Sequence, residues 1–226
     1  MSTILITGAN SGLGLAMAKR LEQDGHYVLT FDKENGLDVR NPDPYVLRPI
    51  KKLDVLINNA GVNIIDWLEN FSEHQWDEVM DVNAKGIFMM TKALLPQLIA
   101  SKGTVMNVVS NAAHMPMTCS LAYNASKGAA HIMTLQLARE LTKKHGITVF
   151  GIAPNKLRGT GMSHSIDQQV VKTRGWTAEE AHNYQVNGML VGEETDPATI
   201  ADLVAFLLSK KENHKYLSGC ILPCGA

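Results

Sequence analysis

The sequence predicts an α/β fold of three layers, in which a doubly wound parallel sheet is covered by helices on both faces. Three observations support this prediction. Short apolar runs alternate with longer amphipathic runs along the 226 residues, as they do when helices connect parallel strands. A glycine-rich turn directly joins the first apolar run to the first helix-like run. The length suits one domain, so we expect residues 1–226 to form a single unit.

The apolar runs predict six strands, and the amphipathic runs between them predict four helices. The strands are expected at Thr3–Ile6, Tyr27–Phe31, Val55–Ile57, Thr104–Val109, Thr148–Ile152 and Gly219–Leu222. The helices are expected at Leu13–Asp24, His74–Ile99, Tyr123–His145 and Pro197–Leu208. The two middle helices are long and carry small and apolar residues on more than one side, so we expect them to pack against another subunit.

Two segments depart from the regular alternation. Between Asp32 and Asp54 there is room only for a short helix near Tyr45–Lys51, because two prolines precede it. The later segment, residues 155–196, shows no strand pattern and contains five glycines that would permit movement. A segment of that length without strands is often functional, and we expect it to be a lid over the substrate.

Composition argues against several classes of function. The formal net charge is −1 and neither sign forms a long run, so we do not expect a nucleic-acid partner. No run approaches the roughly 18–20 apolar residues of a membrane span. The start of the chain lacks a signal-peptide pattern and the chain has only three cysteines, which favours a reduced, cytoplasmic setting. The eight histidines show no zinc-ligand spacing, so no metal site is expected.

The glycine-rich turn is the clearest candidate for a binding site. Gly8 would allow a tight turn, Gly12 would let backbone amides approach a phosphate, and Gly14 would let the helix pack closely on the strand. With the helix N-terminus that follows, the turn predicts a cradle for a dinucleotide pyrophosphate rather than a plain turn. The residues expected to contact the nucleotide here are Gly8, Asn10, Ser11, Gly12, Leu13 and Gly14.

Asp32 indicates which dinucleotide is bound. It follows the strand Tyr27–Phe31, where a carboxylate can accept hydrogen bonds from both hydroxyls of an adenosine ribose. The same charge would repel a 2′-phosphate, and the glycine-rich turn contains no arginine to attract one. We therefore expect NAD rather than NADP, although Lys33 would neutralise part of the charge of Asp32. The segment Asn58–Gly61 ends another strand at the same edge of the sheet and leaves space for a ligand.

A tyrosine and a lysine four residues apart form a candidate acid–base pair. On a helix, Tyr123 and Lys127 lie on one face, so both side chains can act on a single proton. An ammonium beside the phenol would lower the pKa of Tyr123 from about 10 toward neutral pH. The lysine could also hold ribose hydroxyls of a nicotinamide nucleotide. Ser110, at the end of the strand Thr104–Val109, could hydrogen-bond a carbonyl or alcohol oxygen of the substrate. The Tyr–Lys spacing alone also arises by chance, so it indicates function only in combination with the other motifs.

Together these motifs resemble the short-chain dehydrogenase/reductase family, in its compact single-domain branch. They follow one another in the family's order over nearly the whole chain: Thr7–Gly14, Asp38-Val39, Asn58–Gly61, Asn83 within Asp81–Asn83, Ser110 and Tyr123–Lys127. The resemblance implies a Rossmann fold and hydride transfer between NAD(H) and a secondary alcohol or ketone. It also implies a homodimer or homotetramer that assembles through the two long helices.

The resemblance assigns roles to individual residues. Tyr123 would be the general acid and base, and Lys127 would tune it and hold the ribose. Ser110 would steady the substrate oxygen, and Asn83 would hold a water molecule in a proton relay. The implied cofactor contacts beyond the glycine-rich turn are Asp32, Asp38, Val39, Asn59, Ala60, Gly61, Tyr123, Lys127, Pro154 and Thr160, with Asp38 and Val39 at the adenine.

Several positions depart from the family pattern. Pro154 is followed by Asn155 instead of glycine, and Thr160 lies one residue later than the family's nicotinamide-contacting threonine. The chain ends with Pro223–Ala226 in place of Asp-Gly-Gly. Two alternatives to an NAD-dependent alcohol dehydrogenase therefore stay open: an NADP-dependent carbonyl or 3-oxoacyl reductase, and a nucleotide-binding regulator without turnover. The substrate is not identified, and an apolar one is suggested only by methionines near the expected pocket: Met115, Met117, Met162 and Met189.

Overall fold

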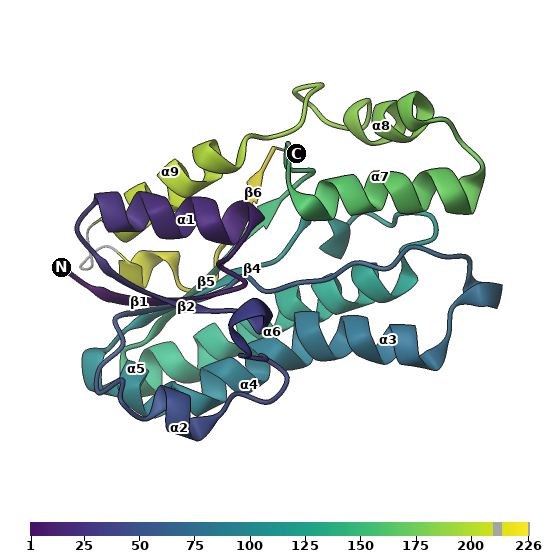
Figure 1. Ribbon diagram of the computed structural model, residues 1–226. Helices are drawn as coiled ribbons and strands as arrows, with labels where there is room; N and C mark the ends of the chain where they lie inside the picture. Colours follow the sequence, from purple (N-terminus) through teal and green to yellow (C-terminus); the bar gives the residue numbers. More distant parts are fainter. Residues whose placement is uncertain (210–213, 226) are drawn as a thin grey trace.

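The computed structural model describes residues 1–209 and 214–225, and within them it confirms the predicted α/β fold (Figure 1). The strands are β1 (Thr3–Thr7), β2 (Tyr27–Phe31), β3 (Val55–Asn58), β4 (Thr104–Val108), β5 (Thr148–Pro154) and β6 (Ile221–Cys224). They form one six-stranded sheet in the order β2-β1-β3-β4-β5-β6, and every neighbouring pair is parallel. The carboxyl ends of the strands therefore share one edge of the sheet, where α/β proteins bind ligands.

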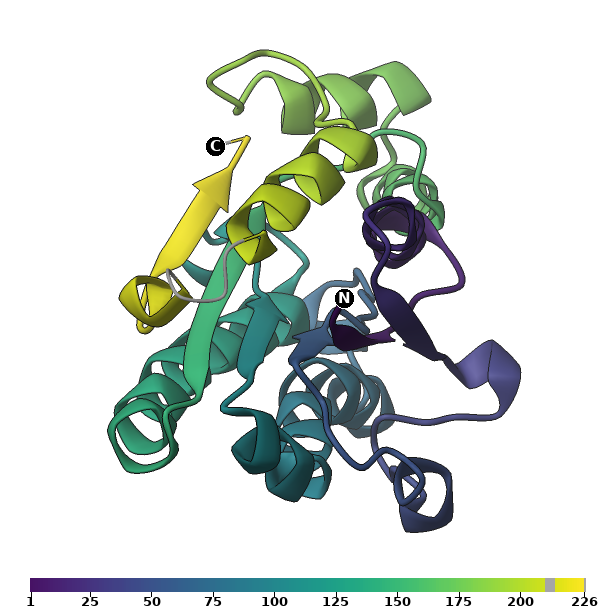
Figure 2. The same ribbon diagram turned by 90° about the vertical axis from the view of Figure 1, so that its left-hand side faces the viewer.

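Helices cover both faces of the sheet and give the predicted three layers (Figures 1 and 2). On one face α1 (Gly12–Gln23) packs beside α9 (Pro197–Leu208). On the other face lie α4 (Gly86–Ala93), α5 (Leu95–Ser101) and α6 (Leu121–His145). Among the described residues, no helix is both long and apolar enough to cross a membrane.

The predicted single helix over His74–Ile99 was wrong in its continuity. The structure has α3 (Glu73–Met80), then a π-helical turn (Asp81–Lys85), then α4, and then a break before α5. The break precedes Pro96, which has no amide hydrogen and restricts the backbone of the residue before it. The π-helical turn carries Asn83, and turns of this kind are frequent at functional sites.

The segment between β2 and β3 contains as little helix as the sequence predicts. It holds a 3-10 turn (Lys33–Asn35) and α2 (Pro44–Leu47). In the described part of the chain β2 has one neighbour, β1, so it forms an edge of the sheet. The short path brings Val39 against α4: a Cβ added at Gly86 would lie 2.9 Å from Val39 Cγ2. Glycine at this position therefore allows the segment to pack closely on the helix.

The segment 155–196 contains two helices, α7 (Gly161–Arg174) and α8 (Ala178–Val186), which lie beside the carboxyl edge of the sheet (Figure 1). A parallel bridge between Leu157 and Thr195 joins the two ends of the segment. Apolar side chains attach it to the loop after β3 in a small cluster formed by Ile65, Val170 and Ala181. We call residues 155–196 the α7–α8 segment.

Candidate active site

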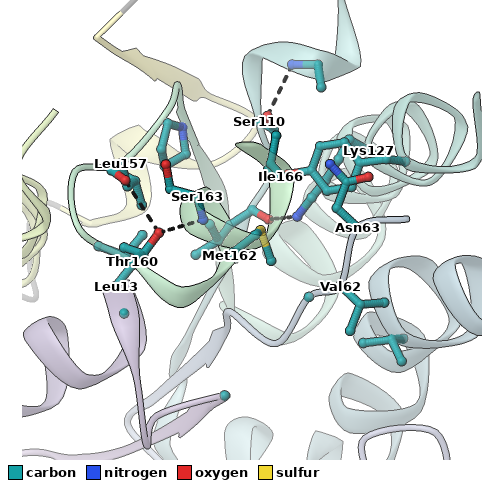
Figure 3. Close-up of a pocket in the computed structure, with 18 of the residues that line it drawn as sticks. Leu13, Val62, Asn63, Ser110, Lys127, Leu157, Thr160, Met162, Ser163 and Ile166 are labelled. Carbon is teal, nitrogen blue, oxygen red and sulfur yellow. Dashed lines mark hydrogen bonds between the residues drawn. The ribbon is translucent and has the colours of Figure 1, made fainter. Parts of the chain in front are cut away.

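A cavity of about 610 Å³ lies at the carboxyl edge of the sheet. Its wall is formed by the turn between β1 and α1, by the residues that follow β2, β3, β4 and β5, and by α7 and α8. Figure 3 shows part of this wall, with Leu13 and Thr160 on one side and Asn63 and Lys127 on the other. We call the part next to Asp32 the β2 end and the part next to the α7–α8 segment the lid end.

The glycine-rich turn has the geometry that its sequence predicts. Gly8 and Gly12 have φ values of +65° and +51°, a region that favours glycine. A Cβ at Gly14 would lie only 2.0 Å from the carbonyl oxygen of Gly8, so the turn and α1 can pack this closely only with glycine there. The first turn of α1 contains no acidic residue, and no side-chain hydrogen bond from Ser11 caps it among the described residues. Its amides therefore suit an anion.

Four of the six predicted residues of this turn line the cavity: Gly8, Ser11, Gly12 and Leu13. The other two, Asn10 and Gly14, support the turn from behind the cavity wall. Asn10 donates its backbone amide to Asp32 Oδ2 at 3.0 Å, and its side-chain amide contacts Glu34 at 3.3 Å. Gly14 lies against the backbone of Gly8.

Asp32 is fixed in the wall of the β2 end. The residue is buried, and its carboxylate accepts the backbone amides of Asn10 at 3.0 Å and Glu34 at 3.1 Å. These bonds use one lone pair on each carboxylate oxygen and hold the group in one orientation. Lys33 lines the same end of the cavity, so the negative charge of Asp32 has a cation next to it in sequence.

Asp38 and Val39 also line the β2 end. Arg40 Nε donates to both carboxylate oxygens of Asp38, at 2.8 and 3.0 Å, and this hydrogen bonding lowers the pKa of the Asp38 carboxyl. The β2 end thus carries the carboxylates of Asp32 and Asp38 beside the cations of Lys33 and Arg40. Because Arg40 is hydrogen-bonded to Asp38, one positive and one negative charge at the β2 end are already paired before a ligand binds.

Asn59 connects the end of β3 to the glycine-rich turn. Its side-chain amide donates to the carbonyl oxygens of Thr7 and Gly8, both at 2.9 Å. In return, Thr7 Oγ1 accepts the backbone amides of Asn59 and Ala60, both at 3.0 Å. Asn59, Ala60 and Gly61 all line the cavity. The predicted segment therefore serves both as cavity wall and as a clamp on the turn.

Asn83 lies in the π-helical turn and is almost completely buried. Its Oδ1 accepts the backbone amide of Val62 at 2.8 Å, and its Nδ2 donates to Val62 O at 2.9 Å and to Ser126 Oγ at 3.0 Å. The side chain does not belong to the cavity wall. It instead holds the strand-end segment at Val62 against α6, one residue from the cavity-lining Gly61.

Ser110, Tyr123 and Lys127 meet in the wall of the cavity. Ser110 follows β4, and its Oγ accepts the backbone amide of Ala112 at 3.1 Å. Tyr123 and Lys127 come from the first turns of α6, and both are buried. Lys127 Nζ donates to Val108 O at 2.9 Å and lies 5.7 Å from the centroid of the Tyr123 ring. The predicted triad is therefore assembled from the end of β4 and one face of α6.

The protonation equilibria of this triad differ from the sequence-based expectation. Burial raises the pKa of Tyr123, and the hydrogen bond with the Ser110 hydroxyl acts in the opposite direction. Burial also lowers the pKa of Lys127 to about 8. The expectation that the lysine ammonium lowers the tyrosine pKa was wrong for this geometry, because desolvation outweighs the opposing hydrogen bond.

The altered loop after β5 still reaches the cavity. Pro154, Asn155 and Thr160 all line it. Thr160 Oγ1 caps α7 by accepting the backbone amide of Ser163 at 3.1 Å. Asn155 Nδ2 donates to Gly225 O at 3.0 Å, so the altered loop contacts the altered end of the chain, whose last residue, Ala226, lies outside the described residues.

Several cavity-lining residues belong to no predicted motif, among them Asn63, Asn111, Lys156 and Arg174. Lys156 is buried and pairs with Asp167 at 2.6 Å and Glu194 at 3.1 Å. Asp167, Glu194 and His182 lie close enough to offer one ligand atom each to a metal ion. The ammonium of Lys156 already contacts both of those carboxylates, so it supplies the positive charge of this cluster.

Comparison with known proteins decides the family. A sequence model described as short chain dehydrogenase matches residues 45–171, which is more than half of the chain. The chain belongs to this family. Sorbitol-6-phosphate 2-dehydrogenase of Klebsiella pneumoniae is 28% identical over 96% of this chain and 92% of the relative. NAD-dependent glycerol dehydrogenase of Listeria innocua is 34% identical over 66% of this chain and 68% of the relative.

A solved structure gives the same result for the fold. Actinorhodin polyketide ketoreductase with NADPH has a TM-score of 0.86 and 26% sequence identity, and the match covers 99% of this chain and 96% of that one. This short-chain dehydrogenase is therefore an oxidoreductase with a Rossmann fold, from a family that uses NAD or NADP. The matched range includes Ser110, Tyr123 and Lys127.

Proposed function

We propose that this short-chain dehydrogenase transfers a hydride between NAD(H) and a secondary alcohol or ketone, with Tyr123 as the general acid and base. The observation that carries the proposal is the shared cavity. The glycine-rich turn and Asp32 line its β2 end, and Ser110 and Tyr123 line the same space toward the lid end. A dinucleotide and a small alcohol bound there would meet within one site.

The β2 end fits a dinucleotide with a free 2′-hydroxyl. The uncapped first turn of α1 and the turn Gly8–Leu13 suit a pyrophosphate, and the fixed carboxylate of Asp32 suits ribose hydroxyls. Asp38 and Val39 would lie at the adenine, and Asn59–Gly61 would line the path toward Lys127. Pro154 and Thr160 would lie at the nicotinamide. When bound, NAD(H) supplies the hydride acceptor or donor.

The triad provides the proton chemistry. In oxidation, the Tyr123 phenolate would take the hydroxyl proton as the carbinol carbon loses its hydride, and in reduction the phenol would return a proton to the oxygen. Ser110 would hold the substrate oxygen and stabilise its developing charge. Lys127, anchored on Val108 O, would hold ribose hydroxyls. Because burial raises the pKa of Tyr123, oxidation should gain from alkaline pH and reduction should proceed near neutral pH.

Asn83 would contribute as a positioning residue. Its three hydrogen bonds fix Val62 and Ser126, so it sets the position of the cavity wall opposite α6. Its Oδ1 would lie 3.4 Å, and Lys127 Nζ 3.9 Å, from a Cβ built on Gly61, so both groups approach the same small region. A water molecule held between them would complete the proton relay that the family resemblance implies.

The α7–α8 segment would act as the substrate lid of a single domain that spans residues 1–226. Its helices line the cavity, and their contacts with the rest of the molecule include a small apolar cluster and a few polar bonds. Such a segment can open and close more readily than the sheet.

We also propose a homodimer or homotetramer that assembles through α4 and α6. Both helices expose large apolar side chains: Phe88 of α4 is 47% exposed, and Ile132 of α6 is 60% exposed. Burial of such residues against a second copy would stabilise an assembly. Sedimentation velocity on the wild type and on Ile132→Glu tests this, with the expected result that only the variant is a monomer.

An NADP-dependent carbonyl or 3-oxoacyl reductase is the second candidate, because Lys33 and Arg40 line the same end of the cavity as Asp32. A 2′-phosphate would need Arg40 to exchange its bonds to Asp38 for new ones. We favour NAD because the Asp32 carboxylate lines the cavity and no arginine or lysine lies within ion-pair distance of it among the described residues.

Tyr123→Phe tests the proposed chemistry and separates it from a regulator without turnover. Secondary alcohols with NAD and ketones with NADH are screened first on the wild type. We expect the variant to lose turnover at least about 100-fold, because it keeps the ring and loses the acid, and to bind NADH as the wild type does. Tyr45→Phe, a tyrosine that is 80% exposed, serves as the matched control. Turnover retained in Tyr123→Phe would overturn the assignment.

A further inference from the structure

The lid end of the cavity contains an arginine that forms no ion pair with a carboxylate of the described residues. Arg174 is the last residue of α7 and lines the cavity. None of the ion pairs among the described residues includes it. Its Nη2 donates to Thr118 O at 2.6 Å, and its guanidinium lies 4.6 Å from the ring centre of Trp176 and 4.7 Å from that of Tyr184. These contacts hold the planar group in place without neutralising it.

The charges along the cavity wall are unevenly distributed. Its acidic lining residues all belong to the β2 end or adjoin it: Asp32, Glu34, Asp38 and Glu78. The other part of the wall holds Lys127, Lys156 and Arg174. Two carboxylates, Asp167 and Glu194, already pair with Lys156, whereas Arg174 forms no ion pair with any described residue. The unpaired guanidinium of Arg174 therefore favours an anion at the lid end.

Buried polar atoms without partners lie in the same wall. The Nε of Arg174, both side-chain amide atoms of Asn63 and the Nδ2 of Asn111 are buried, and none has a hydrogen-bond partner within the described part of the chain. Figure 3 shows Asn63 in the wall near Lys127. A buried polar atom left unpaired is unfavourable, so a ligand that bonds to these groups recovers that cost on binding. Such donors and acceptors fit a substrate with several oxygens.

We propose that the substrate is an alcohol or ketone that carries an oxyanion group, a carboxylate or a phosphate, and that Arg174 binds this group. Asn63 and Asn111 then bond to further oxygens of the substrate between Arg174 and the reacting carbon. This inference rests on the proposed function, because it places the reacting carbon at Tyr123. The Nε and Nη atoms of an arginine can bind an oxyanion through two parallel hydrogen bonds, a geometry that a lysine cannot offer.

The apolar residues of the lid end do not argue against a charged substrate. Met115, Met117 and Met162 line the cavity, and Met189 is buried without lining it. The thioethers can pack against the carbon chain of the substrate while Arg174 binds its charged end. An apolar substrate would leave Arg174 Nε, the side-chain amide of Asn63 and Asn111 Nδ2 without hydrogen-bond partners among the described residues, which makes it the poorer fit.

The test uses matched pairs of ketones that differ in charge: 4-oxopentanoate with its methyl ester, and dihydroxyacetone phosphate with dihydroxyacetone. Isothermal titration measures the binding of each ketone to the complex of the protein with NAD⁺, and in parallel with NADP⁺, in which a ketone cannot be reduced. We expect the anionic member of at least one pair to bind at least about 10-fold more tightly than its neutral partner, as charge-assisted hydrogen bonds predict. The pair that shows the preference distinguishes a carboxylate from a phosphate.

Three variants test whether Arg174 causes the preference for anionic over neutral ketones. Arg174→Gln should remove it and leave the neutral ketones unaffected, whereas Arg174→Lys should retain part of it. Arg158→Gln is the matched control, because Arg158 belongs to the same segment, is exposed and pairs with Glu193. The proposal is overturned if the wild type binds neither anion more tightly than its neutral partner, or if the preference survives in Arg174→Gln. Failure of the proposed chemistry has a separate signature, since Tyr123→Phe would keep its turnover while the titrations retain their dependence on Arg174.

Discussion

The two ends of the cavity are held together by different kinds of contact. At the β2 end, backbone groups dominate: Thr7, Asn59 and Asp32 each bond to main-chain amides or carbonyls close to the strand ends. At the lid end, side chains of the α7–α8 segment make contacts with residues distant in sequence, as in the ion pair of Lys156 with Glu194 and the bond from Arg174 to Thr118 O. The β2 end is therefore rigid scaffold, whereas the lid end depends on contacts that a few substitutions can remove.

The largest expected effect comes from the glycine-rich turn. Gly14→Ala places a Cβ 2.0 Å from the Gly8 carbonyl oxygen, so we expect the free energy of unfolding to fall by more than about 4 kcal/mol, in the range of severe substitutions. Gly161→Ala is the counterpart in the α7–α8 segment, where a Cβ meets no atom within 4 Å. Its effect should stay within about 0.5 kcal/mol. Urea unfolding measures the loss of stability in both variants. Equal losses in Gly14→Ala and Gly161→Ala would contradict the expected difference between the two positions.

The second largest loss of stability is expected on substitution of Lys156, the buried cation of the α7–α8 segment. Lys156→Met leaves Asp167 and Glu194 without their shared partner, so we expect a loss of about 2–3 kcal/mol. The exposed pair Arg158–Glu193 should contribute less than about 1 kcal/mol. Urea unfolding compares Lys156→Met with Arg158→Gln. A similar, small effect in both would show that the segment does not depend on its buried pair.

Unlike the substitutions above, substitution of Lys127 should increase the free energy of unfolding. Burial lowers its pKa from 10.5 to about 8, so the ammonium destabilises the folded protein at neutral pH. We expect Lys127→Met to raise the free energy of unfolding by roughly 2 kcal/mol at pH 7, after the lost bond to Val108 is deducted. Between pH 8 and 10.5 the unfolded chain binds more protons than the folded one, so the wild type gains stability and the difference shrinks. Thermal melts of the wild type and Lys127→Met from pH 6.5 to 10 measure this change. A difference in stability that stays constant over this pH range would contradict the prediction.

The smallest effect is expected at the helix cap that faces the glycine-rich turn. Thr160→Ala removes the oxygen that accepts the Ser163 amide, at a cost of about 1 kcal/mol. Thr160→Ser keeps that oxygen and should cost less. Denaturant midpoints of the pair measure the contribution of the cap. A loss in the serine variant as large as that in the alanine variant would assign the effect to the methyl group near Gly12.

The sequence predicted most of the fold and of the β2 end, because local patterns determine both. The six strands follow from apolar runs, and the turn at Gly8 and Gly12 follows from glycines with positive φ. It did not predict the break before α5 or the π-helical turn at Asn83, since both interrupt a continuous amphipathic pattern.

The lid end was harder to predict, because long-range packing creates it. Nothing beside Arg174 in sequence shows that its guanidinium lies near Thr118 O, 56 residues away. Asn63 and Asn111 gain their significance only from the absence of partners among the residues that surround them in the described structure. The direction of the Tyr123 pKa shift likewise depends on burial, which residue spacing does not reveal.

The proposed NAD-dependent hydride transfer is tested most directly by a side-by-side fluorescence titration of the purified protein with NADH and NADPH. We predict that NADH binds at least about 10-fold more tightly than NADPH, because in the proposed binding mode the Asp32 carboxylate would lie at the 2′ position and repel a phosphate there. Asp32→Asn should then narrow the difference in affinity. Tighter binding of NADPH would contradict the NAD assignment and show that Lys33 and Arg40 govern the β2 end. Binding of neither nucleotide would contradict the proposed hydride transfer itself.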